Sequence, residues 1–324
     1  LQSKINKAET SPTGLVLLRG IIMYDVIIVG GGPAGLTAAL YTLRAGKPAL
    51  VIEKAAFGGQ ITWSPKVENF PTVESGSCSE LADRLMQQVE KQGGETEFAE
   101  VVSVEKQGEV FRITTDYDDV FESRAVIAAV GAKPRALGIS GEEELVGSGV
   151  CYCAVCDGAF YKGKAVAVNG GGNSALQDAM LLSEGCSRVY LIHRRDSFRG
   201  EAKLAEALKK KENVEFVLNS SVTALIGDTE LTAITVTDRE GVSRNIEAEG
   251  LFVAIGHSPD NRVFEELMEL DEAGYVLAGE DCRTRTPGLF TAGDCRRKTV
   301  RQLTTAMADG SAAALAAGSY IDSL

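Results

Sequence analysis

Several features of nucleic-acid-binding, membrane-spanning or secreted proteins are missing from this chain of 324 residues. There is no long basic run, and the formal net charge of −12 makes nucleic acid and anionic membrane surfaces poor candidates for partners. No apolar stretch is long and uninterrupted enough to span a bilayer. Hydrophobic residues make up 44% and charged residues 24%, which is typical of a soluble globular protein, and the length suggests about two domains.

The chain also lacks the dense, even set of cysteines that holds small secreted proteins together. Its cysteines are odd in number and spread along the chain: Cys78, Cys151, Cys153, Cys156, Cys186, Cys282 and Cys295. We therefore expect a cytoplasmic protein with one working redox pair. A second Cys-x-x-Cys and a spaced pair of histidines are absent too, which disfavours a zinc site.

Residues 1–22 lack the arrangement of a signal peptide, in which basic residues precede a longer apolar core and a small-residue cleavage site. Only a short apolar patch occurs there, at residues 15–18. We interpret this segment as a leader or extension outside the fold. The organised part is expected to begin at Met23.

A dinucleotide-binding pattern follows at once. The apolar run at residues 24–29 predicts a strand buried on both faces, and the G-x-G-x-x-G sequence at 30–35 follows it. A helix is expected over 36–45, then a second strand over 49–52 that ends in Glu53. Backbone amides at the helix start can hold a pyrophosphate, and the terminal acid can accept hydrogen bonds from a ribose.

The same architecture returns 140 residues later, counted from Gly30 to Gly170. Residues 165–169 predict a buried strand, residues 170–175 repeat the glycine turn, and a helix and a further strand follow. The chain therefore contains an internal repeat of one dinucleotide-binding unit.

The two units differ at the end of their second strand. Where the first has Glu53, the second has His193, followed by Arg194, Arg195 and Arg199. A carboxylate would repel a 2′-phosphate, whereas arginines attract one and can bind it with two hydrogen bonds. The first unit therefore suits FAD and the second suits NADPH, although a solvated basic turn is the alternative interpretation of the arginines.

Two breaks containing glycine and proline, at residues 131–134 and 256–259, predict hinges. We expect an α/β protein in which residues 23–134 and 260–324 form the FAD-binding domain. Residues 135–259 are expected to form the NADPH-binding domain, which carries the Cys-x-x-Cys.

Cys153 and Cys156 form that Cys-x-x-Cys, and Asp157 follows directly. Close spacing permits an easily reversed disulfide, which a flavin reduced by NADPH can open. A thiolate leaving group needs a proton, which Asp157 could supply if burial raises its pKa. Two alternatives stay open: zinc ligation with Cys151 and His193, or ordinary buried thiols. We interpret Cys151 as a bystander.

Together these patterns closely resemble the low-molecular-weight, bacterial-type thioredoxin reductases. The motifs that carry the resemblance are residues 30–35, 58–60, 68–71, 153–158, 170–175, 193–195, 293–294 and 301–302. The resemblance implies two Rossmann-like (three-layer ββα) dinucleotide-binding domains, with the NADPH domain inserted in the FAD domain. It also implies a homodimer and thioredoxin, or a thioredoxin-like protein, as partner, with no metal.

The resemblance further implies a set of site residues. FAD is expected at Gly30, Gly32, Pro33, Ala34, Gly35, Glu53, Gly59, Gln60, Asn69, Gly293, Asp294, Arg301 and Gln302. NADPH is expected at Gly170, Gly172, Asn173, Ser174, Ala175, His193, Arg194, Arg195 and Arg199. Cys156 is implied to face the flavin, Cys153 to attack the thioredoxin disulfide, and Asp157 to act as the acid. The NADPH domain is implied to rotate between these tasks.

The chain departs from the family pattern at Val130, Asn169 and Thr72, the last of which replaces a common glycine. None of these is a catalytic group. Rival functions are reduction of another small dithiol protein, an oxidase that passes electrons from NADPH to oxygen, and a non-catalytic flavin redox sensor. The arginine cluster argues against relatives that depend on ferredoxin or deazaflavin.

Overall fold

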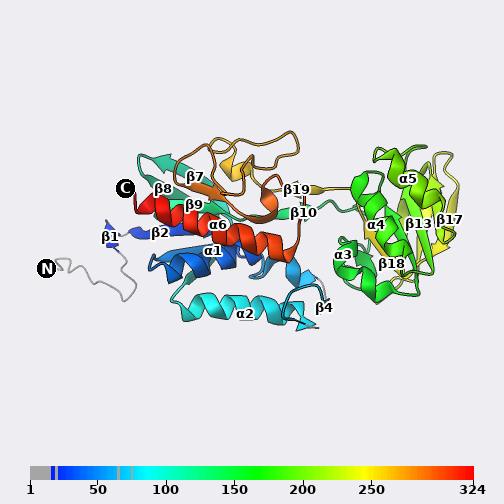
Figure 1. Ribbon diagram of the computed structural model, residues 1–324, viewed down its shortest axis with the longest axis horizontal. Helices are drawn as coiled ribbons and strands as arrows, with labels where there is room; N and C mark the ends of the chain where they lie inside the picture. The colour runs from blue at the N-terminus through cyan, green and yellow to red at the C-terminus, as the bar shows by residue number, and fades with distance from the viewer. Residues whose placement is uncertain (1–15, 19–20, 64–65, 74–75) are drawn as a thin grey trace, which may run out of the picture. The chain divides into compact units, whose positions relative to one another are not determined.

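A computed structural model describes residues 16–18, 21–63, 66–73 and 76–324 (Figure 1). These residues form two compact units. The first contains the described residues up to Thr62, together with Gly76–Lys133 and Ser258–Leu324. The second contains Pro134–His257 and the described part of Trp63–Ser75.

The first unit is built on an eight-stranded sheet with the order β6-β3-β2-β9-β8-β7, in which β1 pairs with β2 and β20 pairs with β9. Strands β3, β2, β9 and β20 run parallel, whereas β7, β8 and β9 form an antiparallel meander. The strands are β1 Val16–Leu18, β2 Ile21–Val29, β3 Ala49–Glu53, β6 Glu95–Phe98, β7 Val101–Gln107, β8 Val110–Thr115, β9 Val120–Ala128 and β20 Leu289–Thr291.

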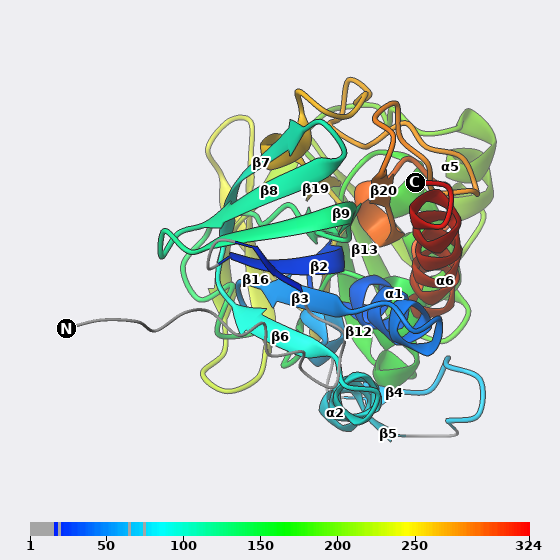
Figure 2. The same ribbon diagram turned by 90° about the vertical axis from the view of Figure 1, so that its left-hand side faces the viewer.

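Helices α1 (Pro33–Arg44), α2 (Cys78–Lys91) and α6 (Leu303–Ile321) pack with one face of this sheet into a single apolar core. Figure 2 shows α1 and α6 lying side by side. The alanine- and glycine-rich sequence of α6 permits this close packing. Gly310 lies so near the Ala34 carbonyl oxygen that a Cβ on it would be only 2.2 Å away, so a larger residue there would push the helices apart. A second core of meander and strand residues fills the opposite face.

The second unit has a five-stranded parallel sheet in the order β11-β18-β12-β13-β14 and a three-stranded antiparallel sheet, β15-β16-β17. Helix α4 packs beside β12 and β13, so this unit repeats the strand–helix–strand pattern of the first. The elements are β11 Val150–Cys151, α3 Ala154–Asp157, β12 Ala165–Asn169, α4 Asn173–Ser183, β13 Arg188–His193, α5 Ala202–Lys209, β14 Val214–Leu218, β15 Ser220–Ile226, β16 Ala233–Asp238, β17 Ser243–Glu247 and β18 Gly250–Val253.

The chain passes between the units at β10 (Ala132–Pro134) and β19 (His257–Pro259), which pair with each other as a two-stranded sheet. The Arg135 N–H extends this pairing by donating to the Gly256 carbonyl at 2.9 Å. Both strands fall on the segments that the glycine–proline breaks marked as hinges. The remaining short elements are β4 Lys66–Val67, β5 Gly76–Ser77 and the 3₁₀ turns Gly59–Trp63, Gly158–Tyr161, Arg262–Phe264 and Gly293–Cys295.

The predicted α/β fold with two Rossmann-like units is confirmed. Strand β2 spans Ile21–Val29 and so includes the predicted strand at residues 24–29, and β1 pairs with it in antiparallel register from Val16 to Leu18, before the expected start of the fold at Met23. The rest of the expected leader lies outside the described residues. The described part of Trp63–Ser75, expected in the first domain, groups with the second unit.

Thr72 has a φ of 73°, the left-handed conformation that favours glycine. A glycine would adopt this conformation without the steric cost of a side chain. In the described parts of the chain, no helix is both long and apolar enough to cross a membrane.

Candidate active site

The first glycine turn joins β2 to α1, and two of its glycines are required by close backbone contacts. Gly30 has a φ of 110°, and a Cβ there would lie 2.3 Å from the carbonyl oxygen of Ala129. A Cβ on Gly35 would lie 1.8 Å from the Gly30 carbonyl oxygen. Larger residues at either position would separate the turn from the strand or the helix.

The outer part of this turn is open. No described atom lies within 4 Å of a Cβ built on Gly32, and α1 begins there without a side-chain cap, with Pro33 in its first turn. Glu53 closes the turn from the side, because its carboxylate accepts the Gly31 N–H at 2.6 Å and the Ala55 N–H at 2.7 Å. An uncapped helix start beside an oriented carboxylate fits the pyrophosphate and ribose of a dinucleotide.

Gly293 and Asp294 bring a second acidic residue to the same helix. A Cβ on Gly293 would lie 2.8 Å from the Cβ of Ala34, so this turn touches the first turn of α1. Asp294 follows with a buried Oδ1 that has no hydrogen-bond partner among the described residues, and burial raises its pKa. Buried polar atoms rarely stay unpaired. A bound hydroxyl donor, such as that of a flavin side chain, would satisfy this oxygen.

Three further predicted flavin residues lie in the first unit. Gly59 approaches the glycine turn directly, because a Cβ on it would lie 3.1 Å from the Cα of Gly32. Gln60 is oriented by its Nε2, which donates to the Ala132 carbonyl at 3.0 Å. Gln302 is the N-cap of α6 in a capping box.

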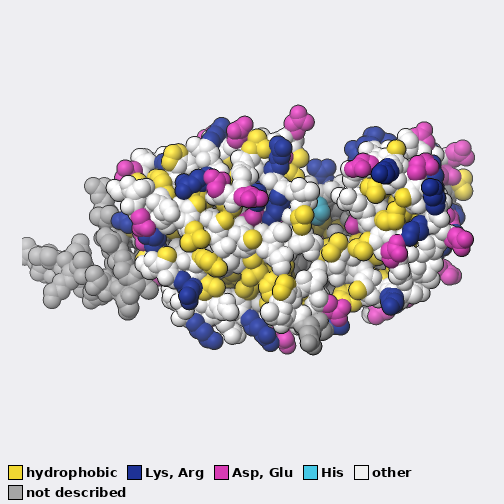
Figure 3. All heavy atoms as spheres, in the orientation of Figure 1, with side chains coloured by type: hydrophobic (Ala, Val, Ile, Leu, Met, Phe, Trp, Pro, Cys, Tyr) yellow, Lys and Arg dark blue, Asp and Glu magenta, His cyan; other side chains and the backbone are white. Residues whose placement is uncertain are grey.

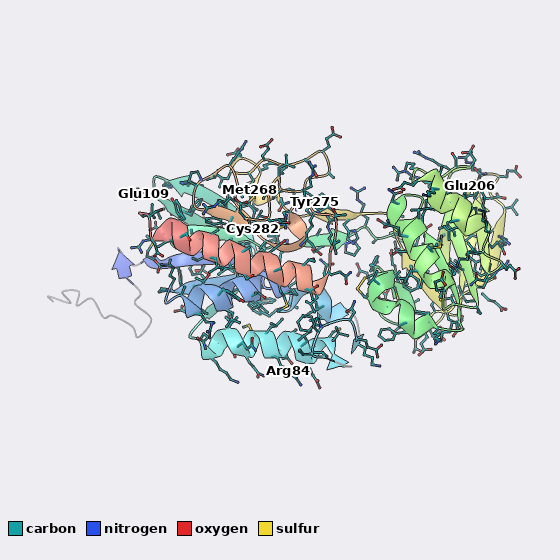
Figure 4. All side chains as sticks on the ribbon, viewed as in Figure 1. Arg84, Glu109, Glu206, Met268, Tyr275 and Cys282 are labelled. Carbon is teal, nitrogen blue, oxygen red and sulfur yellow. A yellow bond between two sulfur atoms is a disulfide. The ribbon has the colours of Figure 1, made fainter. Side chains whose placement is uncertain are left out.

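Arg301 and Asn69 complete the predicted flavin set. The guanidinium of Arg301 stacks on the ring of Tyr275 at 4.4 Å, and its buried Nε has no hydrogen-bond partner among the described residues. Tyr275 is labelled in Figure 4. Asn69 is exposed and groups with the second unit, so its place at a flavin stays a prediction.

The second glycine turn joins β12 to α4 in nearly the same way. A Cβ on Gly170 would lie 2.4 Å from the carbonyl oxygen of Ala254, and Gly172 is open to at least 4 Å at the uncapped start of α4. Here the last position of the motif is Ala175, which is fully buried. The second turn therefore also fits a dinucleotide pyrophosphate.

His193 lies against this turn. Its ring occupies the place of a Gly171 side chain, with Cε1 2.2 Å from a Cβ built there. The ring is 6% exposed and stacks on Phe198 at 5.5 Å between centroids. Burial, and then the neighbouring arginines, lower the pKa of His193. A buried neutral imidazole supports the turn, and direct contact of His193 with a cofactor stays a prediction.

The arginines occupy the exposed loop after β13. Arg194, Arg195 and Arg199 are all exposed. The N–H groups of Arg199 and Gly200 donate to the Gly171 carbonyl at 2.7 and 3.1 Å, so this loop folds back onto the glycine turn.

Asn173 and Ser174 begin α4 beside this loop, and both are exposed. Asn173 Oδ1 accepts the Glu201 N–H at 2.7 Å. The loop–turn contacts therefore place cations next to the proposed pyrophosphate site, where a 2′-phosphate would need them.

Cys153 and Cys156 are joined by a disulfide. Cys153 is the N-cap of the short helix α3, and its Sγ accepts the Cys156 N–H at 3.2 Å. Asp157 ends the helix and is 8% exposed. Because zinc binds thiolates, sulfurs bonded to each other favour the redox interpretation. No cluster of three or more potential metal ligands occurs among the described residues.

Cys151 lies next to this pair in the chain, but burial makes its thiol unreactive. Its thiol contacts the Tyr161 hydroxyl at 3.3 Å and is 4% exposed. Burial, and then the charge of Asp157, raise the pKa of Cys151 to about 12. The group is therefore a neutral thiol near pH 7, which is consistent with the bystander interpretation.

The family model for pyridine nucleotide-disulphide oxidoreductases matches residues 24–310. The chain belongs to this family. The family relative named thioredoxin reductase from Listeria innocua is 40% identical over 304 residues, 93% of this chain and 95% of that protein. The thioredoxin reductase of Bacillus subtilis is 38% identical and covers 93% of this chain and 96% of its own.

Solved structures within the family agree. The crystal structure of thioredoxin reductase from Streptococcus pyogenes has a TM-score of 0.88 and 35% identity, covering 93% of this chain and 99% of that chain. The thioredoxin reductase from Giardia duodenalis has a TM-score of 0.85 and 34% identity, over 93% and 99% of the two chains. The resemblance to thioredoxin reductases seen in the motifs is confirmed.

A buried ionic cluster beside Asp294 was not predicted from the sequence. It consists of Asp309 on α6 with Arg296 and Lys298, which follow the Gly293–Asp294 turn. The available signal was Asp309 itself, a lone acid on the apolar face of α6, between Ala306 and Ala313.

Proposed function

We propose that this protein is an NADPH-dependent flavoprotein that reduces the disulfide of thioredoxin, or of a thioredoxin-like protein. The observation that carries the proposal is the Cys153–Cys156 disulfide in a chain with two dinucleotide turns. Family membership implies the use of a flavin and of a pyridine nucleotide. The relatives named thioredoxin reductase support thioredoxin as the partner.

We assign FAD to the first unit and NADPH to the second. Glu53 and the open Gly32 support the first assignment, because a carboxylate beside the turn favours ribose hydroxyls and disfavours a 2′-phosphate. The exposed arginines at 194, 195 and 199 support the second, because they supply the charge that a 2′-phosphate requires.

A flavin bound in the first unit would accept hydride from reduced nicotinamide and deliver two electrons to a disulfide. Reduction of the Cys153–Cys156 bond consumes two electrons and up to two protons. Asp157 is positioned to exchange one proton with the pair, because it adjoins Cys156 and is shielded from water. Our assignment of Cys156 to the flavin side follows the family resemblance.

Cys153 then attacks the disulfide of the partner. Its thiolate displaces one partner sulfur and forms a mixed disulfide, and Cys156 attacks Cys153 to release the partner as a dithiol. The Cys156 N–H that donates to the Cys153 sulfur would stabilise a thiolate there. Since the dithiol and the proposed flavin site belong to different units, we propose that the units rotate during turnover.

We also propose a homodimer. Figure 3 shows apolar side chains gathered over α1 and α6, and in these helices Tyr41 and Leu315 are 43% and 60% exposed. Large exposed apolar side chains on a helical face favour burial against another chain. Analytical ultracentrifugation of the purified protein tests this, and a single monomeric species at micromolar concentration would contradict it.

An anaerobic titration with NADPH tests the function. We expect bleaching of the flavin absorption and, after thioredoxin is added, formation of free thiols and recovery of the flavin colour. Bleaching without transfer to any thioredoxin would contradict the proposal. Consumption of NADPH that is fast in air and unaffected by thioredoxin would indicate an oxidase, and slow turnover with every acceptor would indicate a redox sensor.

A further inference from the structure

Asp309 is the centre of the ionic cluster in the first unit. It is 6% exposed, and it accepts hydrogen bonds from Arg296 Nε at 2.8 Å and Nη2 at 2.7 Å. Lys298 Nζ adds a third at 2.9 Å, and the Gly293 N–H a fourth at 3.0 Å. One buried carboxylate therefore joins two cations to the backbone of the turn that precedes Asp294.

Such a cluster is an unfavourable way to stabilise a core. Charges moved out of water lose solvation that their mutual attraction only partly restores, and apolar replacements are often as stable. Here two cations face one anion, so the cluster carries an excess positive charge beside Asp294. Its position points to a role at that turn beyond core stability.

Helix α6, which carries Asp309, also contacts the first turn of α1 at the proposed flavin site. Gly310, next to Asp309, packs so closely that a Cβ on it would lie 2.2 Å from the Ala34 carbonyl oxygen in the first turn of α1. Gly293 meets the Ala34 side chain from another direction, with 2.8 Å to a built Cβ. Asp309 therefore lies where α6, the glycine turn and the Gly293–Asp294 turn converge.

Other contacts fix Asp309 in place. The thiol of Cys282, labelled in Figure 4, donates to the Asp309 carbonyl at 3.5 Å. Arg296 Nη1 donates to the Ala278 carbonyl at 3.4 Å. Because α6 is packed against α1, the carboxylate has little freedom to move away from the Gly293 N–H.

We propose that Asp309 is a positioning residue for the flavin dinucleotide. Its carboxylate holds the Gly293 N–H so that Asp294 faces the cofactor, and its charge balances Arg296 and Lys298. This rests on the flavin site of the proposed function. Asp309 does not touch the reacting atoms, and its effect is transmitted through Gly293 and Asp294.

The test is the release of flavin from the purified holoprotein. On dilution, flavin fluorescence rises as the cofactor dissociates, and the final level gives its affinity. We expect Asp309→Asn to weaken flavin affinity by about tenfold or more, because the amide presents only one acceptor oxygen and leaves two cations uncompensated. Asp309→Glu, which restores the charge, should recover part of the affinity.

The control is Ile113→Ala. Ile113 is fully buried in β8, in the core on the sheet face away from α1 and α6. Its truncation leaves a cavity in this core and should lower the thermal unfolding midpoint, while the Gly293–Asp294 turn stays unchanged. If Asp309 has only a structural role, Asp309→Asn should release flavin no faster than Ile113→Ala when the two variants lose the same thermal stability. That result would overturn the proposal.

Lys298→Gln decides the matter if Asp309→Asn fails to fold. Lys298 bonds the same Oδ2 atom that accepts the Gly293 N–H, so its loss should speed flavin release in the same direction, but less. Unchanged release would overturn the proposal. A wild-type protein that retains FAD but does not reduce thioredoxin would contradict only the proposed function, whereas wild-type affinity in Asp309→Asn would contradict only this inference.

Discussion

The two glycine turns of this chain have the same backbone arrangement but different neighbouring side chains. In each, the first glycine approaches the carbonyl of the residue after a neighbouring parallel strand, Ala129 in one unit and Ala254 in the other. In each, the third glycine is open and begins a helix without a side-chain cap. The middle glycine meets Phe57 and Glu53 in the first unit, but the His193 ring in the second.

The comparison distinguishes the backbone groups that could hold a pyrophosphate from the side chains that could select one dinucleotide over another. The shared part is backbone, which any pyrophosphate can use. The differing part lies at the end of the second strand, where Glu53 is tied to two backbone amides while the arginines after His193 are exposed. We therefore propose that selectivity between dinucleotides comes from a few side chains, and that the backbone of the turn is common to both units.

The largest effect is expected from Cys153→Ser, which should abolish the function of the dithiol without changing either glycine turn. In Cys153→Ser, NADPH should still reduce the flavin, while thioredoxin reduction falls to background because the attacking sulfur is gone. Stopped-flow absorbance measures the first step and the release of thioredoxin thiols the second. Ser183→Ala, on a helix of the same unit, is the control. Residual thioredoxin reduction in Cys153→Ser would contradict the assigned role.

Gly30→Ala and Gly170→Ala test each turn separately. An alanine at Gly30, with its φ of 110°, adds strain of about 1–3 kcal/mol to a steric clash, so flavin content should fall about tenfold or more. Gly170→Ala should keep its flavin and lose reduction by NADPH. Flavin-to-protein ratio and anaerobic titration measure the two outcomes, and flavin loss in Gly170→Ala alone would reverse our assignment.

The arginine loop should show a smaller effect. Arg194→Ala with Arg195→Ala should raise the KM for NADPH by at least about 10- to 100-fold, since the loss of even one charge-assisted hydrogen bond costs about 1.5–3 kcal/mol. The KM for NADH should change little. Arg244→Ala removes an exposed arginine elsewhere in the second unit and is the matched control. Equal losses for both nucleotides would argue for a solvated basic turn instead.

The smallest effect concerns the helices that follow the turns. At the position of buried Ala38 in α1, helix α4 has Asp178, and burial raises the pKa of Asp178 to about 6. The folded state holds this proton more tightly than the unfolded state, so stability is lost as the pH rises from about 4 to 6.

Asp178→Asn should therefore raise the free energy of unfolding by about 1–2 kcal/mol at pH 8, after discounting for partial exposure, and by little near pH 4. Urea unfolding at both pH values measures the change. Asp228→Asn, at an exposed site in the same unit, is the matched control. A pH-independent gain in Asp178→Asn would refute the explanation.

The local parts of this structure could be predicted from the sequence. Each glycine turn, its flanking strand and its helix lie within about thirty residues, and short-range patterns determine them. The Cys153–Cys156 pair was found for the same reason.

The parts that could not be predicted depend on contacts between distant residues. Asp309 accepts a hydrogen bond from Arg296, which is 13 residues earlier in the sequence, and only the packing of α6 brings the two side chains together. The sequence shows His193 at a strand end, but its burial against Gly171 depends on how the loop after β13 folds back. The pairing of β1 with β2 was missed because a short apolar patch is ambiguous without its partner.

The pairing of β10 with β19 gives the chain a modular character. Paired strands lie about 5 Å apart, so the entry and exit points of the stretch 134–257 are neighbours. A short turn between Lys133 and Ser258 would close the remaining chain without stretching it. Acquisition or removal of this stretch therefore needs no rerouting of the first sheet, and the internal repeat is consistent with one nucleotide-binding module having been inserted into another.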